Sequence, residues 1–272
     1  MQDKNISYSK NFKHIVNKTS ERRLTTNYKS ILNYIKKITK KHDSLLDIGS
    51  GYGTFLNIAK NSIKVIGIEP SLNLYKNSVK KYPIKVLNLS FNKYFKQNKN
   101  SKFDVITLIH VIEHIQDPAD LIKKTLLLLN KNGMLFIETP NLNSFLFKAE
   151  QHKYTFLTPP EHLFIFSKYS FFKIIYNLNN SKIVKISSYS YVEHSVKILK
   201  TFLIPNFNKN KLHRHKNMTS LIHDRGQKSS FIMIKKVVFY FIFHKIIGPI
   251  ISLTTKINNK GTFLQLYIRK TT

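Results

Sequence analysis

The sequence predicts an α/β protein in which helices cover both faces of a mostly parallel sheet. From residue 44 to about residue 191, short apolar runs typical of strands alternate with stretches of helical periodicity. Strands that alternate with helices are joined by right-handed crossovers, which make the sheet mostly parallel and place helices on both faces. The chain has 272 residues, of which 42% are hydrophobic, and this is enough for one large domain with a packed core.

The expected elements follow one another in a regular order. Residues 1–23 are polar and basic and lack the apolar segment of a signal peptide, so we expect a flexible arm there. Residues 23–41 have apolar side chains at helical spacing, with lysines on the other face. We expect a single domain over residues 24–272, with residues 192–260 as a helical and loop insertion before the last strand. Strands are expected at residues 45–48, 64–68, 84–89, 103–108, 134–137, 182–191 and 262–268. Further helices are expected at residues 55–60, 71–81, 120–129 and 169–178.

The composition limits the classes of site that the chain can carry. It has no cysteine, which excludes disulfides and thiolate metal sites and fits a reducing cytosol. The net charge of +31 comes almost entirely from lysine, with 40 lysines against 5 arginines. Two explanations stay open: lysines that fill solvated positions in an AT-rich genome, or a dedicated site for a polyanion. Arginine, which makes bidentate contacts to phosphates and bases, is scarce, so nucleic acid is not the expected partner.

A glycine-rich turn follows the first expected strand. Three of the eight glycines, Gly49, Gly51 and Gly53, lie there and open a helix. Glycines allow a sharp turn and the close approach of a ligand to the backbone. The spacing is not the G-x-G-x-x-G of dinucleotide-binding proteins, and the turn is preceded by the acidic Asp47. A carboxylate disfavours a phosphate and accepts a cation, so the pattern favours a ligand such as a sulfonium amino acid.

A second acidic residue, Glu69, ends the next strand. It lies 22 residues after Asp47. A carboxylate at this strand end can accept hydrogen bonds from both hydroxyls of a ribose. A solvent-exposed acid at the start of a helix is the alternative interpretation.

These features, with four later segments, resemble class I S-adenosylmethionine-dependent methyltransferases. The likeness extends to the subset related to ubiquinone-biosynthesis and glycan-modifying methyltransferases. It covers residues 24–191 and 261–270. The segments that carry it are LLDIGSGYG (45–53), GIEPS (67–71), FDVI (103–106), HVIEH with DP (110–118), GMLFIETPN (133–141) and HLFIFS (162–167).

The resemblance implies a Rossmann-like, seven-stranded sheet whose last strand is antiparallel, and S-adenosylmethionine as the cofactor. It implies that Asp47, Gly49 and Gly51 hold the methionine part, that Glu69 holds the ribose, and that Pro70 and Ser71 border the adenine. Gly53 and His110 complete the expected cofactor-binding residues. The chain departs from the family after the third strand, where Asn88 stands in a segment that often carries an acidic residue near the adenine amine.

Methyl transfer to oxygen or nitrogen usually also needs a general base, and a base must lie at the carboxyl ends of the strands. We favour His114 or His162 as the base. Capping of a turn or bonding of a backbone carbonyl by His114, or ordering of a loop by His162, is the alternative for each. The other polar candidates are His110, Glu113, Glu138, Asn141 and Glu161. We expect no metal site: His213 and His215 have only Asp224 as a nearby carboxylate.

Residues 231–253 form the most apolar stretch of the chain. Lysines and Pro249 interrupt it, and its segments are too short to span a bilayer. Two interpretations stay open: a pair of helices over the acceptor pocket, or an element at a membrane surface with lysines at the headgroups.

The expected function is methyl transfer to a small-molecule, sugar or lipid-linked acceptor. We expect it in the cytoplasm, with peripheral membrane contact at the inner face as one possibility. An RNA methyltransferase and a non-catalytic scaffold of the same fold are the alternatives. The oligomeric state is not predicted.

Overall fold

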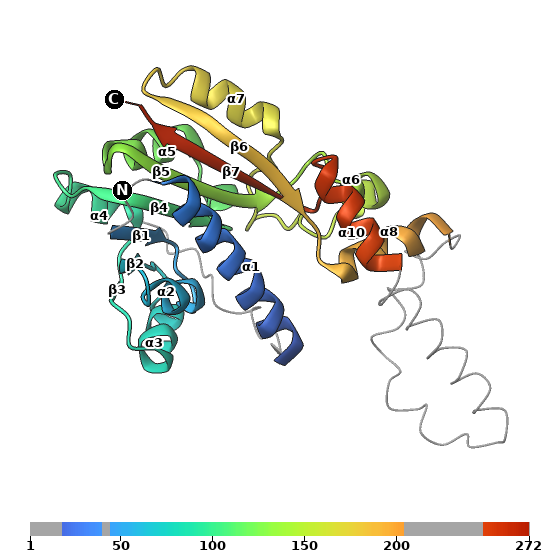
Figure 1. The fold of residues 1–272 in the computed structure, drawn as a ribbon, viewed down its shortest axis with the longest axis horizontal. Helices are drawn as coiled ribbons and strands as arrows, with labels where there is room; N and C mark the ends of the chain where they lie inside the picture. The colour runs from blue at the N-terminus through green and yellow to red at the C-terminus, as the bar shows by residue number, and fades with distance from the viewer. Residues whose placement is uncertain (1–17, 40–43, 204–246, 272) are drawn as a thin grey trace. The chain divides into compact units, whose positions relative to one another are not determined.

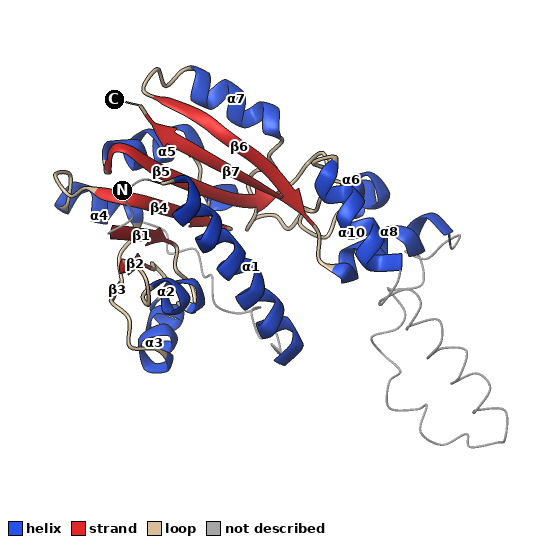
Figure 2. Cartoon of the chain, viewed as in Figure 1, coloured by secondary structure: helices blue, strands red, loops and turns tan. Residues whose placement is uncertain are grey.

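The computed structural model describes residues 18–39, 44–203 and 247–271 (Figure 1). It contains one seven-stranded sheet with the order β3-β2-β1-β4-β5-β7-β6, in which β7 is antiparallel. Helices surround the sheet (Figure 2), so the predicted fold class is confirmed. The strands are β1 (Ser44–Ile48), β2 (Lys64–Ile68), β3 (Val86–Leu87), β4 (Phe103–Ile109), β5 (Leu129–Pro140), β6 (Ser181–Tyr189) and β7 (Phe263–Lys270). The α-helices are α1 (Lys18–Ile38), α2 (Thr54–Ala59), α3 (Leu72–Lys81), α4 (Phe91–Gln97), α5 (Pro118–Leu127), α6 (Phe145–Glu150), α7 (Lys168–Tyr176), α8 (Val192–Leu203) and α10 (Gly248–Ile257), and the 3-10 helices are η1 (Ile112–His114) and η2 (Gln151–Lys153).

Strand β1 lies between β2 and β4, and its register brings three loops together. Asp47 of β1 is paired with Gly67 of β2 and with Thr107 of β4, all in parallel. The carboxyl ends of these strands therefore lie at the same edge of the sheet. The glycine turn, the residues after β2 and the turn after β4 meet at that edge.

The packing of the core explains why the strands are continuous apolar runs in the sequence. Ile31 and Ile35 of α1 pack in one buried cluster with Leu45 of β1, Val105 of β4 and Phe136 of β5. Neighbouring residues of these strands point to the opposite face of the sheet. Those neighbours are also buried, so both faces are covered. They include Leu46, Ile106, Leu135 and Ile137.

Some boundaries differ from the predicted ones. Helix α1 begins at Lys18 rather than at Arg23. Strand β3 consists only of Val86–Leu87, where residues 84–89 were expected. Helix α4 was not predicted. The side chain of Ser90 caps it by accepting a hydrogen bond from the amide of Lys93. With only seven residues, the helix is too short to show a clear helical periodicity in the sequence.

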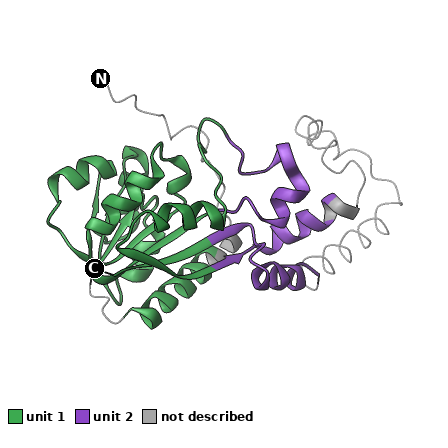
Figure 3. Ribbon diagram, turned by 90° about the horizontal axis from the view of Figure 1, so that it is seen from above, with its two compact units in different colours: residues 1–139, 159–186, 265–272 green, residues 140–158, 187–264 purple. Residues whose placement is uncertain are grey.

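The chain divides into two compact units (Figure 3). Unit 1 comprises residues 1–139, 159–186 and 265–272 and contains the core described above. Unit 2 comprises residues 140–158 and 187–264. Within unit 2, Glu150 of α6 forms an ion pair with Lys197 of α8 and accepts a 2.7 Å hydrogen bond from the amide of Thr155.

Much of the predicted insertion lies outside the described residues. This applies to residues 204–246, with His213, His215, Asp224 and most of the apolar stretch 231–253, and to residues 1–17 of the expected arm. Pro249 lies in the first turn of α10 and begins that helix rather than interrupting one. Among the described residues, no helix is both long and apolar enough to cross a bilayer.

Candidate functional site

The glycine turn between β1 and α2 has a backbone that only glycine adopts without strain. Gly49, Gly51 and Gly53 have φ angles of 71°, 54° and 72°. A Cβ atom at Gly51 would meet nothing within 4 Å, whereas one at Gly49 would lie 2.5 Å from Val111. Gly49 is therefore required by packing against the turn after β4. Gly51 borders open space that a ligand can occupy.

Glu69 is buried at the end of β2 and holds the glycine turn in place. One of its carboxylate oxygens accepts a 2.8 Å hydrogen bond from the amide of Gly51, and the other accepts a 2.9 Å bond from the amide of Ser71. Burial raises the pKa of Glu69, and these two backbone hydrogen bonds oppose the rise. The residue is therefore not the exposed acid of the alternative interpretation.

Asp47 is a second buried carboxyl beside the same turn. Its Oδ1 accepts a 2.6 Å hydrogen bond from the hydroxyl of Thr107 in β4. Burial raises the pKa of Asp47 to about 7; the bond from Thr107 opposes the rise, and the neighbouring charge of Glu69 adds to it. A cationic ligand would stabilise the ionised form of this carboxyl. Thr107 is a site residue that was not predicted from the sequence; with Asp104, it is one of two polar residues in an otherwise apolar strand.

The segment after β2 is fixed by Asn88. Its amide nitrogen donates to the carbonyls of Glu69 (2.8 Å) and Pro70 (3.1 Å). Ser71 is the N-cap of α3 and accepts from the amide of Leu74. The residue that departs from the family pattern therefore positions the backbone at which the adenine was expected.

These residues fit S-adenosylmethionine. Two buried carboxyls, Asp47 and Glu69, adjoin a turn whose Gly51 faces open space. The cofactor has a sulfonium and an ammonium cation, which suit Asp47, and ribose hydroxyls, which suit Glu69 as their acceptor. A pyrophosphate would be repelled by both carboxyls.

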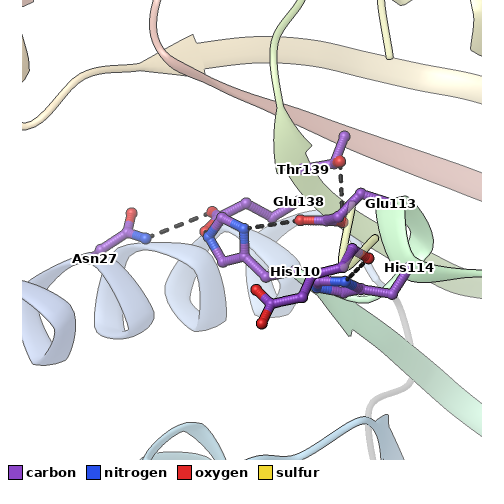
Figure 4. Close-up of polar contacts among 7 residues, drawn as sticks. Asn27, His110, Glu113, His114, Glu138 and Thr139 are labelled. Atoms are coloured by element: carbon purple, nitrogen blue, oxygen red, sulfur yellow. Dashed lines mark hydrogen bonds and ion pairs between the residues drawn. The ribbon is translucent and has the colours of Figure 1, made fainter. Parts of the chain in front are cut away.

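His110 lies directly after β4, between two buried carboxylates (Figure 4). Its Nδ1 is 3.3 Å from Oε1 of Glu113 and its Nε2 is 3.3 Å from Oε1 of Glu138. Burial alone would lower the pKa of His110, but hydrogen bonds with both carboxylates and their charge raise it to about 10. Burial raises the pKa of Glu113, but the hydrogen bond and the charge of His110 outweigh burial. The pKa of Glu113 is therefore below its usual value. At neutral pH, His110 is thus an imidazolium.

Three further polar groups hold these two carboxylates. Oε2 of Glu138 accepts from the amides of Gln265 in β7 (2.8 Å) and Asn27 in α1 (3.5 Å). Oε2 of Glu113 accepts a 3.0 Å bond from the hydroxyl of Thr139. These contacts of Asn27, Gln265 and Thr139 were not predicted, because each residue is distant in the sequence from the carboxylate that it contacts.

The two proposed bases lie side by side. The ring centroids of His114 and His162 are 4.7 Å apart and the rings meet edge to face. The segment that carries His162 is fixed to η1, because the amides of Leu163 and Phe164 both donate to the carbonyl of Glu113 (2.9 and 3.2 Å). Nδ1 of His114 lies 2.7 Å from the carbonyl oxygen of Glu161, which is the contact that the alternative interpretation expected. Since a carbonyl only accepts, Nδ1 carries a proton, and in the neutral ring Nε2 is left as the proton acceptor.

Glu113, His114 and His162 also offer ligand atoms that lie within 4.8 Å of one another. Two imidazoles and a carboxylate are a donor set for a divalent transition metal. The protonated His110 competes with such an ion for Glu113. The expectation of no metal site therefore stays a prediction, and it can be tested.

Asn141, a candidate from the sequence, has a structural role within unit 2. Its amide nitrogen donates to the carbonyl of Gly261 (2.8 Å) and its oxygen accepts from the amide of Asn143 (3.0 Å). The first bond ties the turn after β5 to the segment before β7, and the second stabilises that turn after β5. A side-chain amide is in any case too weak a base to take a proton from an acceptor.

Comparison with solved structures gives the fold. A SAM-dependent methyltransferase from Archaeoglobus fulgidus superposes with a TM-score of 0.55 at 18% identity, covering 92% of this chain and 95% of that one. The plantazolicin methyltransferase BpumL in complex with SAH gives a TM-score of 0.53 at 15% identity, covering 94% and 86%. The fold is thus the Rossmann-like fold of these methyltransferases.

The sequence comparison gives the family. A profile described as methyltransferase domain matches residues 20–177, more than half of the chain. The chain therefore belongs to the methyltransferase-domain family, and its cofactor is S-adenosylmethionine.

Two curated relatives are similar over parts of their length. A tRNA U34 carboxymethyltransferase of Campylobacter jejuni is 33% identical over 112 residues, which are 39% of this chain and 38% of that protein. A ubiquinone biosynthesis O-methyltransferase of Coxiella burnetii is 31% identical over 123 residues, which are 43% of this chain and 51% of that protein. The chain thus spans about half or less of these relatives, and they act on different acceptors.

Proposed function

We propose that this chain transfers a methyl group to a small-molecule, sugar or lipid-linked acceptor, with His114 or His162 as general base. The observation that carries the proposal is the orientation of His114. Its Nδ1 donates to the carbonyl of Glu161, and its ring contacts that of His162. An imidazole held in one tautomer is prepared to accept a proton at Nε2.

The division of labour follows from the side chains. The bound cofactor supplies a methyl group already activated by its sulfonium. Asp47 and Glu69 hold the donor in place, and placement is the main contribution that such a reaction needs. His110 holds its proton at neutral pH, since its pKa is raised to about 10, and so it serves in cofactor binding and positioning rather than as the base. His114 or His162 accepts the proton of the acceptor.

The decisive experiment is a methyl-transfer screen with isotopically labelled cofactor against lipid, sugar and RNA extracts of the source organism. Label in the lipid or sugar fraction supports the proposal. His114→Ala and His162→Ala should then be assayed on the fraction that is labelled. Binding of S-adenosylhomocysteine without transfer to any fraction would favour the non-catalytic scaffold.

An RNA acceptor is the second candidate, favoured by two observations. One relative acts on tRNA, and the net charge of +31 attracts polyanions. Label confined to the RNA fraction would establish this candidate and overturn the first.

The same proposal includes the place of action. We place the chain in the cytoplasm, at the inner face of a membrane when the acceptor is lipid-linked. The absence of cysteine is consistent with a reducing compartment.

A further inference from the structure

We propose that the outer face of helix α7 docks the protein on an anionic lipid bilayer. Helix α7 has two apolar faces, of which unit 1 covers only one. Phe171 and Ile175 are buried, whereas Tyr169, Phe172 and Tyr176 are 61%, 45% and 85% exposed. Their spacing of three and four residues places these three rings on one side of the helix. A surface helix normally presents polar side chains to water, so this face has the character of a contact surface.

The exposure of these rings is not the result of a loose helix end. Ser167 and Ser170 form a capping box at the start of α7. On the inner side, the ring of Phe171 lies 5.1 Å from that of Phe166. The helix is therefore fixed at its start and along its inner face, and it presents the rings from a rigid support.

The charges around this face select the partner. Lys168 and Lys173 lie on the same helix, and Lys182 is exposed on the neighbouring edge strand β6. The segment of residues 162–192 contains no Asp or Glu. Aromatic rings flanked by lysines, without acidic residues, are complementary to anionic headgroups above an acyl interior.

A bilayer fits this face better than a nucleic acid does. Tyrosine is enriched where one end of a side chain is apolar and the other is wet, as at a membrane interface. Single-stranded nucleic acids are usually bound in a charged groove, often with arginine. Here the rings project from a helix whose only charged residues are lysines.

The aromatic surface extends toward the candidate bases. Leu163 and Phe164 are each 42% exposed and directly follow His162. The ring of Phe164 lies 5.8 Å from that of Phe166, which joins it to the ring contacts under α7. Docking by this surface would bring His162 near the lipid phase, where a lipid-linked acceptor resides. That link to the acceptor rests on the proposed function, whereas the docking itself does not.

The test is sedimentation of the full chain with vesicles of equimolar phosphatidylcholine and phosphatidylglycerol, without cofactor or acceptor. The variant carrying Tyr169→Ser, Phe172→Ser and Tyr176→Ser should bind these vesicles about tenfold or more weakly, because the apolar side supplies part of the affinity. Its unchanged thermal unfolding and S-adenosylhomocysteine binding would show that it is folded. The matched control is Val79→Ser, an exposed apolar residue on the lysine-rich helix α3, which should bind as the wild type.

A second pair of variants tests the charges. Lys168→Glu with Lys173→Glu should weaken binding more than Lys80→Glu with Lys81→Glu, which changes the net charge equally on α3. Equal loss in the two pairs would show attraction by overall charge and overturn the docking face. The docking face would also be overturned if the triple serine variant bound the vesicles fully, or if the wild type did not bind them. A triple serine variant that lost only RNA binding, measured by gel shift, would overturn it as well. Methyl transfer is measured separately, so failure here leaves the proposed function standing.

Discussion

Replacement of Glu69 by glutamine should separate cofactor binding from the stability of the fold. The change keeps the size of the side chain and one acceptor oxygen, and it exchanges the other oxygen for a donor that faces a backbone amide. Glu69 accepts bonds of 2.8 and 2.9 Å from Gly51 and Ser71, so one of them is lost. A hydrogen bond to a charged group is worth about 1.5–3 kcal/mol. Burial raises the pKa of Glu69 because it disfavours the charged carboxylate, so the neutral glutamine regains part of this free energy. We therefore expect a stability loss of about 1–2 kcal/mol.

The effect on cofactor affinity should be separable and comparable in size. Glutamine cannot accept from two hydroxyls as a carboxylate does. We expect S-adenosylhomocysteine to bind more weakly by about 1–3 kcal/mol, which is about 5- to 150-fold in Kd. Isothermal titration calorimetry measures this change, and thermal unfolding of the apoprotein measures the loss of stability.

Asp104→Asn is the matched control. Asp104 is also buried, and it accepts hydrogen bonds from Ser44 and Asn130 at the amino ends of the strands, away from the glycine turn. This variant should lose stability while keeping its affinity for S-adenosylhomocysteine. Wild-type affinity in Glu69→Gln would refute the role of Glu69, and an equal loss of affinity in both variants would show that binding merely follows stability.

Three further predictions concern the histidines. His114→Ala or His162→Ala, whichever removes the base, should keep cofactor affinity and lose about 10²–10⁴-fold in turnover; lost cofactor binding would instead indicate a structural role. His110 has a folded-state pKa of about 10 against 6.5 when unperturbed, so its stabilising contribution is complete below pH 6.5 and disappears as the pH rises through 10. Melting temperatures of the wild type should therefore fall over that window more steeply than those of His110→Gln, and parallel curves would contradict the pairing. EDTA should leave turnover unchanged, because His110 and Thr139 already occupy Glu113; a loss that Mn²⁺ restores would show that His114 and His162 are metal ligands.

The sequence predicted the positions of those candidate residues that lie at the end of a strand. Asp47, the glycines and Glu69 lie where parallel strands β1 and β2 finish, and the pattern of apolar runs places such residues together. The partner of Asp47 could not be predicted in this way, because Thr107 reaches it only through the register between β1 and β4.

The arrangement of His110, His114 and His162 also depends on contacts between distant segments, which no local pattern contains. His110 has a φ of 54°, which turns its ring toward Glu113 and Glu138, and a sequence gives no sign of that backbone angle. His162 reaches His114 through backbone bonds between two distant segments. The resemblance singled out both histidines as candidate bases, and the fold adds that they are neighbours.

The division of the chain assigns the chemistry to one of its parts. The residues proposed here to hold the methyl donor, the imidazolium and the base all belong to unit 1, although the segment with His162 returns to it only after residues 140–158. The described residues of 140–158 and 187–264 supply none of these groups. Exchange of unit 2 would therefore leave the sequence positions of the proposed reactive groups unchanged. A chimera that carries unit 2 of a relative should retain affinity for the methyl donor, and any altered acceptor preference in it would map specificity to the exchanged segments.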